Sequence, residues 1–184
     1  MPRSKLPSVT QVLRFVNSQA FANIPVETLE RARDRGIDFH QLAALYAQKL
    51  FIMEIPEDCA GYFKSFCRWH DAVVEEVVLV ETVLVHPVFH FRGKPDEIVR
   101  LKGDSSNWLT LPDWKTPLPL SKDWRLQLAA YRELALVNGY NVMRVASLQP
   151  KKDGKRARFE EYKTLSADFA VFLNALMVWR FYNA

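Results

Sequence analysis

Two acidic residues and one amine lie close together near the middle of the sequence. Asp113 and Lys115 belong to an Asp-Trp-Lys run, and Asp96 follows the Gly-Lys-Pro segment at 93–95. Side chains two residues apart in a strand point to the same face, so Asp113 and Lys115 would share a pocket while Trp114 enters the core. Two carboxylates and an ammonium group at strand ends can hold a divalent metal ion beside a phosphate group. These three acidic and basic residues are therefore the candidates for chemistry.

Another acidic residue, Glu81, interrupts the nearly continuous aliphatic run Val77–Val85, which we predict to be a strand. A buried carboxylate without a partner is costly. Glu81 therefore lies either on an open face of the strand or in a polar site, and the sequence favours both equally.

The first part of the chain is predicted to be helical. One helix begins directly after Ser8, a good N-cap residue. A second covers Val26–Arg35 and either continues through Gly36 to Leu50 or breaks at the glycine. A third covers Glu57–His70, where aromatic residues recur at spacings of three and four and predict a buried face.

The elements that must position the acidic residues come next in the chain. Strands are expected at Val77–Val85, Ile98–Leu101 and Trp108–Trp114, joined as an antiparallel meander with a turn at 102–107. Asp96 and Asp113 would then lie on neighbouring strands.

The C-terminal part should alternate between helices and strands. A helix at Lys122–Val137 ends at Asn138-Gly139. The strands Asn141–Gln149 and Arg158–Lys163 flank a basic hairpin turn, and a helix at Leu165–Tyr182 follows. This order predicts an α/β or α+β fold, a mixed sheet flanked by helices. We expect a single domain over residues 1–184, with a helical N-terminal part (1–72) and a core (73–184).

Charge, cysteine spacing and the lengths of the apolar runs indicate which partners and which cellular location to expect. The chain has 184 residues, 49% hydrophobic, with a net charge of +4 and a pI of about 9.1, which is compatible with a polyanionic partner. Cys59 and Cys67 have neither metal-ligand nor disulfide spacing, so we expect buried free thiols. No apolar run reaches membrane-span length and the N-terminus is short and basic, which leads us to expect a cytoplasmic or nucleoid-associated protein and no membrane partner.

Several of these motifs, taken together, resemble the PD-(D/E)XK nuclease superfamily in its RecB-like exonuclease branch. Gly93-x-x-Asp96, Asp113-x-Lys115 and Gln127-x-x-x-Tyr131 occur in that family's order. Gly36-x-x-x-His40 matches the branch's upstream histidine motif, and Glu81 matches a glutamate often found in the strand before Gly-x-x-Asp. The chain is similar to mitochondrial genome maintenance exonucleases and phage nucleases over nearly its whole length. The third motif begins with Asp where Glu is commoner, and the cysteines of the iron–sulfur relatives are absent.

The resemblance implies a restriction-endonuclease-like core with an N-terminal helical extension and a metal-dependent DNA exonuclease activity. It implies Mg²⁺ or Mn²⁺ as cofactor, and no iron–sulfur cluster. The metal ligands would be His40, Asp96, Asp113 and the carbonyl group of Trp114. Lys115 would orient or deprotonate the attacking water, Gln127 and Tyr131 would support the site, and Glu81 would lie behind the ligands or bind a second metal.

The partner expected from the resemblance is DNA, single-stranded or at duplex ends. Phosphate contacts are predicted for basic residues of the hairpin turn and of the helix at Lys122–Val137, and Trp108 or Trp124 could stack on a base. The predicted DNA-contacting cations are Lys151, Lys152, Lys155, Arg156, Arg125 and Arg132, with Lys94 and Lys122 beside them.

Other functions remain compatible with the sequence. They are a structure-specific endonuclease, a non-catalytic DNA-binding module on a nuclease fold, and a nuclease acting on RNA. A phage or recombination context, an annealing protein or helicase as partner, and a homo-oligomer are all compatible with the same motifs.

Overall fold

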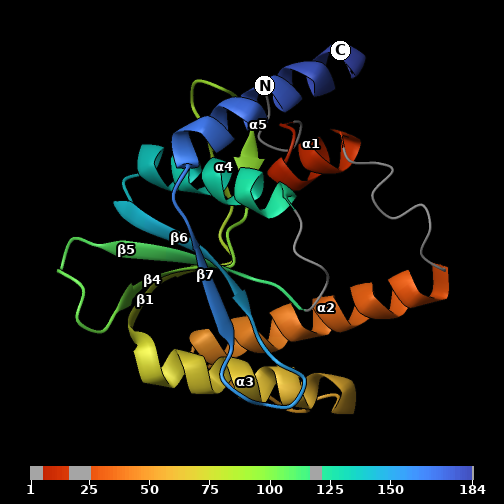
Figure 1. Ribbon diagram of the computed structural model, residues 1–184, viewed down its shortest axis with the longest axis vertical. Helices are drawn as coiled ribbons and strands as arrows, with labels where there is room; N and C mark the ends of the chain where they lie inside the picture. The colour runs from red at the N-terminus through yellow and green to blue at the C-terminus, as the bar shows by residue number, and fades with distance from the viewer. Residues whose placement is uncertain (1–5, 17–25, 117–121, 184) are drawn as a thin grey trace.

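The computed structural model describes residues 6–16, 26–116 and 122–183, except for the side chains of residues 26, 28 and 29. A mixed five-stranded sheet forms the middle layer, between α1, α4 and α5 on one face and α2 and α3 on the other (Figure 1). The protein therefore has a three-layer α/β architecture, which confirms the predicted fold class. Among the described residues, no helix is long and apolar enough to cross a membrane.

The helices lie close to where the sequence places them. Ser8 caps the first, because its hydroxyl accepts from the backbone N–H of Gln11 while the Gln11 side chain accepts from the backbone N–H of Ser8. The second helix continues through Gly36 without a break. Their bounds are α1 Val9–Val16, α2 Val26–Ala47, α3 Glu57–Val73, α4 Asp123–Val137 and α5 Leu165–Tyr182.

The central sheet has the strand order β1-β4-β5-β6-β7. The first three strands form the predicted antiparallel meander, β6 runs parallel to β5 after the α4 crossover, and β7 returns antiparallel to β6. The strands are β1 Val74–Val80, β4 Glu97–Leu101, β5 Leu109–Trp114, β6 Val142–Gln149 and β7 Arg158–Tyr162.

One predicted strand has the wrong extent. The aliphatic run Val77–Val85 is divided, because β1 ends at Val80 and Glu81 adopts a positive φ of 46° that turns the chain out of the sheet. The last part of the run, β2 (Leu84–Val85), pairs with β3 (Arg92–Gly93) in a separate two-stranded sheet. Hydrophobic pattern alone did not reveal this turn.

Two hydrophobic clusters hold the layers together. The first joins α1, α4 and α5 to one face of the sheet and includes Phe91, Leu128 and Phe172. The second joins α2 and α3 to the opposite face and includes Phe66 and Trp114. Because Trp114 is fully buried in the second cluster, the end of β5 is anchored at the point where Asp113 and Lys115 must be positioned.

Both cysteines are free thiols, but only Cys59 is buried as predicted, whereas Cys67 is half-buried. We expect both to react slowly in the native protein. Burial raises the pKa of Cys59 to about 11 and that of Cys67 to about 12. A raised pKa keeps a thiol protonated at pH 8, so Cys59 should have roughly a hundredth of the thiolate of a free cysteine. Ellman's reagent should therefore label both residues only after denaturation. Immediate labelling of both in native buffer would contradict this expectation.

Candidate active site

A proline in β5 limits the pairing of this strand with β4 near its C-terminal end. Pro112 lacks an N–H group, and within the described residues β5 pairs with β4 only at Thr110 and Val99. Alternate residues of a strand direct their N–H groups to the same side, so the next N–H on the β4 side belongs to Trp114. It donates to Asp96 Oδ2 at 2.6 Å. The end of β5 is thus joined to Asp96 by a side chain rather than by the sheet.

His40 contacts acceptors with both ring nitrogens. Nε2 lies 3.0 Å from the carbonyl oxygen of Trp114, and Nδ1 lies 3.2 Å from Asp96 Oδ1 and 3.8 Å from Glu81 Oε1. A neutral imidazole carries only one N–H, so one of the two sides would place a lone pair against an acceptor. Either a proton or a cation between Nδ1 and the carboxylates satisfies both sides.

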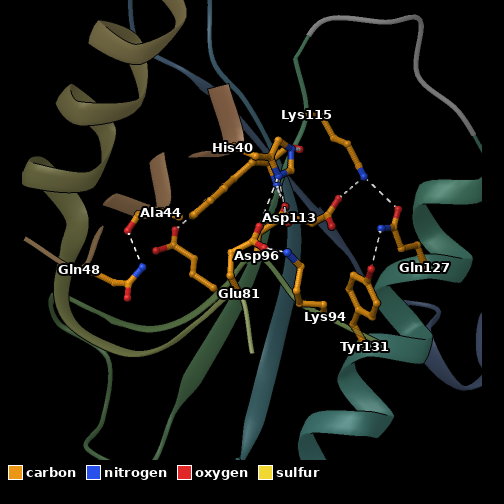
Figure 2. Close-up of polar contacts among 12 residues, drawn as sticks. His40, Ala44, Gln48, Glu81, Lys94, Asp96, Asp113, Lys115, Gln127 and Tyr131 are labelled. Carbon is orange, nitrogen blue, oxygen red and sulfur yellow. Dashed lines mark hydrogen bonds and ion pairs between the residues drawn. The ribbon is translucent and has the colours of Figure 1, made fainter. Parts of the chain in front are cut away.

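Glu81 lies in a polar site, which answers the question that the sequence left open. The residue follows β1, and its backbone N–H donates to the carbonyl oxygen of Asp96 at 2.9 Å. Its half-buried carboxylate faces His40 and forms an ion pair with Lys94 (Figure 2). Left-handed backbone conformations in residues other than glycine are unfavourable and concentrate at functional sites.

Lys115 is held on three sides. Its Nζ lies 2.5 Å from Asp113 Oδ2, donates to Gln127 Oε1 at 2.9 Å, and lies 5.8 Å from the centre of the Trp124 ring. The contact with Asp113 is an ion pair by distance without hydrogen-bond geometry, and Asp113 Oδ2 is otherwise an unpaired buried acceptor. Gln127 Nε2 then donates to the hydroxyl of Tyr131 at 3.2 Å (Figure 2).

The glycine of the Gly-x-x-Asp motif lies where a side chain would collide with α4. A Cβ atom at Gly93 would lie 2.6 Å from Leu134 Cδ1 and 2.7 Å from Tyr131 Cε1. Such distances require the neighbours to move. Gly93 therefore allows Tyr131, and with it Gln127, to approach the carboxylates.

A buried acid supports the site from the face of the sheet that α2 and α3 cover. Glu97 is fully buried, and its Oε1 accepts from the indole N–H of Trp114 at 3.0 Å. Its Oε2 lies 3.4 Å from His70 Nε2. Because the backbone of Trp114 contacts both Asp96 and His40, Glu97 fixes the strand that arranges these ligand candidates.

Burial and neighbouring charges act in opposite directions on the carboxyl groups. Burial raises the pKa of Asp113 to about 6 although Lys115 lies beside it. Burial also acts to raise the pKa of Asp96, but His40 and Lys115 outweigh it and hold that pKa below its usual value. Burial lowers the pKa of His40, and the attraction of Asp96 outweighs this effect, so the pKa is raised overall. Asp96 is therefore an anion at neutral pH, whereas Asp113 is close to its titration range.

The donor groups suit a divalent cation. Among the described residues, His40, Glu81 and Asp96 each offer a ligand atom, and these atoms lie within 4.8 Å of one another. One imidazole and two carboxylates form a donor set that accommodates Mn²⁺ or Mg²⁺. Asp113 Oδ2, which has an ion pair with Lys115 but no hydrogen bond, is a further carboxylate oxygen of the site. The set includes Glu81 as a direct ligand candidate, whereas the resemblance gave His40, Asp96, Asp113 and the carbonyl group of Trp114. That carbonyl oxygen contacts His40 Nε2 instead.

The cluster opens into a cleft of about 940 Å³ between α1 and α2. His40, Glu81, Asp96, Gln127 and Tyr131 all line it. Basic side chains line the same cleft, namely Arg14, Arg33, Arg92 and Lys94. The cations along this cleft can attract a polyanion, and a divalent metal ion would offset the negative charge of the carboxylates.

Some of the predicted DNA-contacting residues are exposed, and others form hydrogen bonds or ion pairs within the protein. The four hairpin cations are exposed, and the hairpin itself is fixed to α3 by Ser65, which contacts the backbone of Lys151 and Lys155. Arg125 forms a paired contact with Asp168, and Arg132 donates to the carbonyl oxygen of Val142. These two arginines therefore stabilise the fold, whether or not they also contact a ligand.

The two tryptophans proposed for base stacking differ in exposure. Trp124 is buried beside Lys115, so its ring cannot stack on a base. Trp108 is exposed just before β5, so its ring is accessible for base stacking.

Sequence reasoning did not identify Glu97, Arg14 or Arg33 as candidates. Glu97 carried a usable signal, an acidic residue that begins an apolar strand directly after Asp96. The arginines carried no signal, because their positions depend on how α1 and α2 face one another across the cleft.

Comparison with known proteins does not assign the chain to a family. No protein-family model matches it, and no curated protein matches its sequence.

Proposed function

We propose that this chain is a divalent-metal-dependent deoxyribonuclease of the PD-(D/E)XK type that acts as an exonuclease. The observation that carries the proposal is the position of the Lys115 ammonium group, held between Asp113 and Gln127 beside the His40–Glu81–Asp96 cluster. The order of elements also supports it, since a helix, a three-strand meander, a crossover helix and a parallel strand form the core of that nuclease family.

Hydrolysis of a phosphodiester requires a positioned water and compensation of negative charge on the phosphate. A divalent ion held by His40, Glu81 and Asp96, with Asp113 beside it, would supply charge neutralisation and a lowered pKa for water. Lys115 would add a fixed positive charge beside a bound phosphate and would orient the attacking water. Gln127 keeps the amine in place, and the hydrogen bond from Gln127 to Tyr131 restrains the amide.

Metal-dependent digestion of DNA tests the proposal. End-labelled single- and double-stranded DNA should be degraded with Mg²⁺ or Mn²⁺ and remain intact with EDTA. Asp113→Ala and Lys115→Ala should each reduce the rate by roughly 10²–10⁴-fold. Activity that survives both substitutions would point to a contaminant or another site. Covalently closed circular DNA should resist digestion, and its cleavage would indicate an endonuclease instead.

If the hairpin cations contact DNA, they should contribute to the salt dependence of DNA affinity. Each phosphate contact that is lost should reduce the slope of log affinity against log salt by about one. Neutralising Lys151, Lys152, Lys155 and Arg156 together should therefore flatten the slope, as measured by fluorescence anisotropy with labelled DNA in EDTA. An unchanged slope would remove the hairpin from the binding surface. The corresponding change of Arg14 and Arg33 reports separately on the cleft.

A further inference from the structure

Helix α5 presents an outer face without charged side chains. The helix lies at the edge of the molecule (Figure 1). Its inner face packs on α4 and α1 through Phe172 and Leu176. Its two charged residues are used within the fold, because Asp168 binds Arg125 and Arg180 donates to the carbonyl oxygen of His90. Ser166 and Tyr182 are exposed at its two ends, and along its outer side the exposed residues are Ala167, Ala170, Val171, Asn174, Met177, Val178 and Phe181.

These exposed residues recur at intervals of three and four, so they form one continuous stripe on the helix. The outer face of a surface helix is normally polar, and a contiguous exposed apolar patch marks an interaction site. Phe181 is 79% exposed and Met177 is 67% exposed. The ring contacts of Phe181 with Tyr182, and of Tyr182 with Phe15 on α1, extend the patch beyond the helix.

The stripe is complementary to itself. Asn174 lies at its centre, and on either side the residues fall into pairs at equal distances: Ala167 with Phe181, Ala170 with Val178, and Val171 with Met177. In each pair the smaller side chain precedes Asn174 and the larger follows it. Two such helices placed antiparallel, with a two-fold axis at Asn174, would set the large residues of one copy against the small residues of the other.

We propose that the outer face of α5 is the interface of a homodimer in which the two α5 helices pack antiparallel about Asn174. The two Asn174 amides can donate to and accept from each other, and a single polar residue in an apolar seam fixes the register. A standard interface buries roughly 800 Å² per partner. A fully buried aromatic side chain accounts for about 150–250 Å², and Phe15, Phe181 and Tyr182 are 39%, 79% and 70% exposed. The three rings can therefore bury roughly 280–470 Å², and the aliphatic stripe adds to this.

The absence of charge along this face favours a second copy over a charged partner. A nucleic acid or an acidic protein would find no complementary charge on α5, whereas the size pattern fits its own two-fold image. The dimer does not depend on the proposed nuclease activity, so either proposal can fail without the other.

Measurement of molar mass in solution provides the first test. Light scattering coupled to size exclusion should give the mass of two chains, compared with 21.3 kDa for one. Phe181→Glu should convert the dimer to a monomer with an unchanged circular dichroism spectrum, because the side chain makes few contacts within the fold. Met53→Glu is the matched control, since Met53 is 89% exposed in the α2–α3 connection and should leave the dimer intact. A monomeric wild-type protein, or a dimer that survives Phe181→Glu, would overturn the proposal.

Thiol crosslinking tests the antiparallel register. Asn174→Cys lies on the two-fold axis and should be joined to its own copy by a short bifunctional maleimide. Ala167→Cys and Phe181→Cys alone should not crosslink, because each would lie about 21 Å along the helix from its own copy. A mixture of these two variants should crosslink. Crosslinking of all three variants alone would indicate parallel helices and contradict the proposed dimer. If the wild-type protein bound lipid vesicles and the monomeric Phe181→Glu variant did not, the outer face of α5 would be a membrane-binding surface instead.

Discussion

Asp96→Asn should remove both metal binding and DNA hydrolysis. Asp96 is the carboxylate that contacts His40 through one oxygen and the backbone N–H of Trp114 through the other. An asparagine loses the negative charge and one of these two acceptors. Even the loss of a partner that only orients a metal ligand typically costs 10–100-fold in metal affinity, so this direct change should weaken Mn²⁺ binding by about 10²-fold or more. The hydrolysis rate should fall on the order of 10³-fold.

Lys115→Met is the control that separates the effect on metal binding from the effect on DNA hydrolysis. It removes the ammonium group but keeps most of the unbranched side chain. Because Lys115 is not a ligand candidate, Mn²⁺ affinity measured by calorimetry without DNA should change little, while hydrolysis should fall as in Asp96→Asn. If Lys115→Met abolished Mn²⁺ binding, or if Asp96→Asn bound Mn²⁺ like the wild type, the assignment of these roles would be wrong. Thermal unfolding of both variants should verify that they fold.

Gly61→Ala should cause a large loss of stability. Gly61 lies on α3 where the β6–β7 hairpin crosses it, and a Cβ atom there would lie 1.7 Å from the carbonyl oxygen of Lys152. Backbone cannot rotate away as a flexible side chain can, so the hairpin must leave α3. The overpacking cost of about 3 kcal/mol or more exceeds the gain of about 1 kcal/mol in helix propensity. A net loss of roughly 2 kcal/mol should lower the melting temperature by about 4–8 °C.

Gly36→Ala is the same chemical change, but we expect it to raise the stability of the protein instead of lowering it. Gly36 lies inside α2, and a Cβ atom there would meet only Thr116 Oγ1 at 3.6 Å, an ordinary contact. Replacing a glycine inside a helix by alanine stabilises by roughly 0.5–1 kcal/mol. Differential scanning calorimetry should therefore show a higher melting temperature for Gly36→Ala and a lower one for Gly61→Ala. Equal shifts of the two variants would refute the explanation by local packing.

The sequence predicted the elements well where one local signal dominates. Ser8 and Gln11 form a capping box, Asn138 and Gly139 end α4, and α5 has the predicted bounds, because each depends on residues within a few positions. The antiparallel meander and the pairing of Asp113 with Lys115 followed from the alternation of side chains along a strand. The prediction of one strand from Val77 to Val85 was wrong. Both parts of this run are equally apolar, and only the backbone turn at Glu81 divides them.

Residue types and spacing alone were enough to select the candidate side chains, to place Asp113 on its strand and to place Gln127 on its helix. Glu81 and Asp96, which were expected on strands, lie just outside β1 and β4. The tertiary structure decided where Glu81 points, that Glu97 supports Trp114 from behind, and that Arg14 and Arg33 line the same cleft as the carboxylates. Such contacts join residues that are far apart in the chain. Local propensity and periodicity contain no information about which distant surfaces meet, because that is set by how the helices pack on the two faces of the sheet.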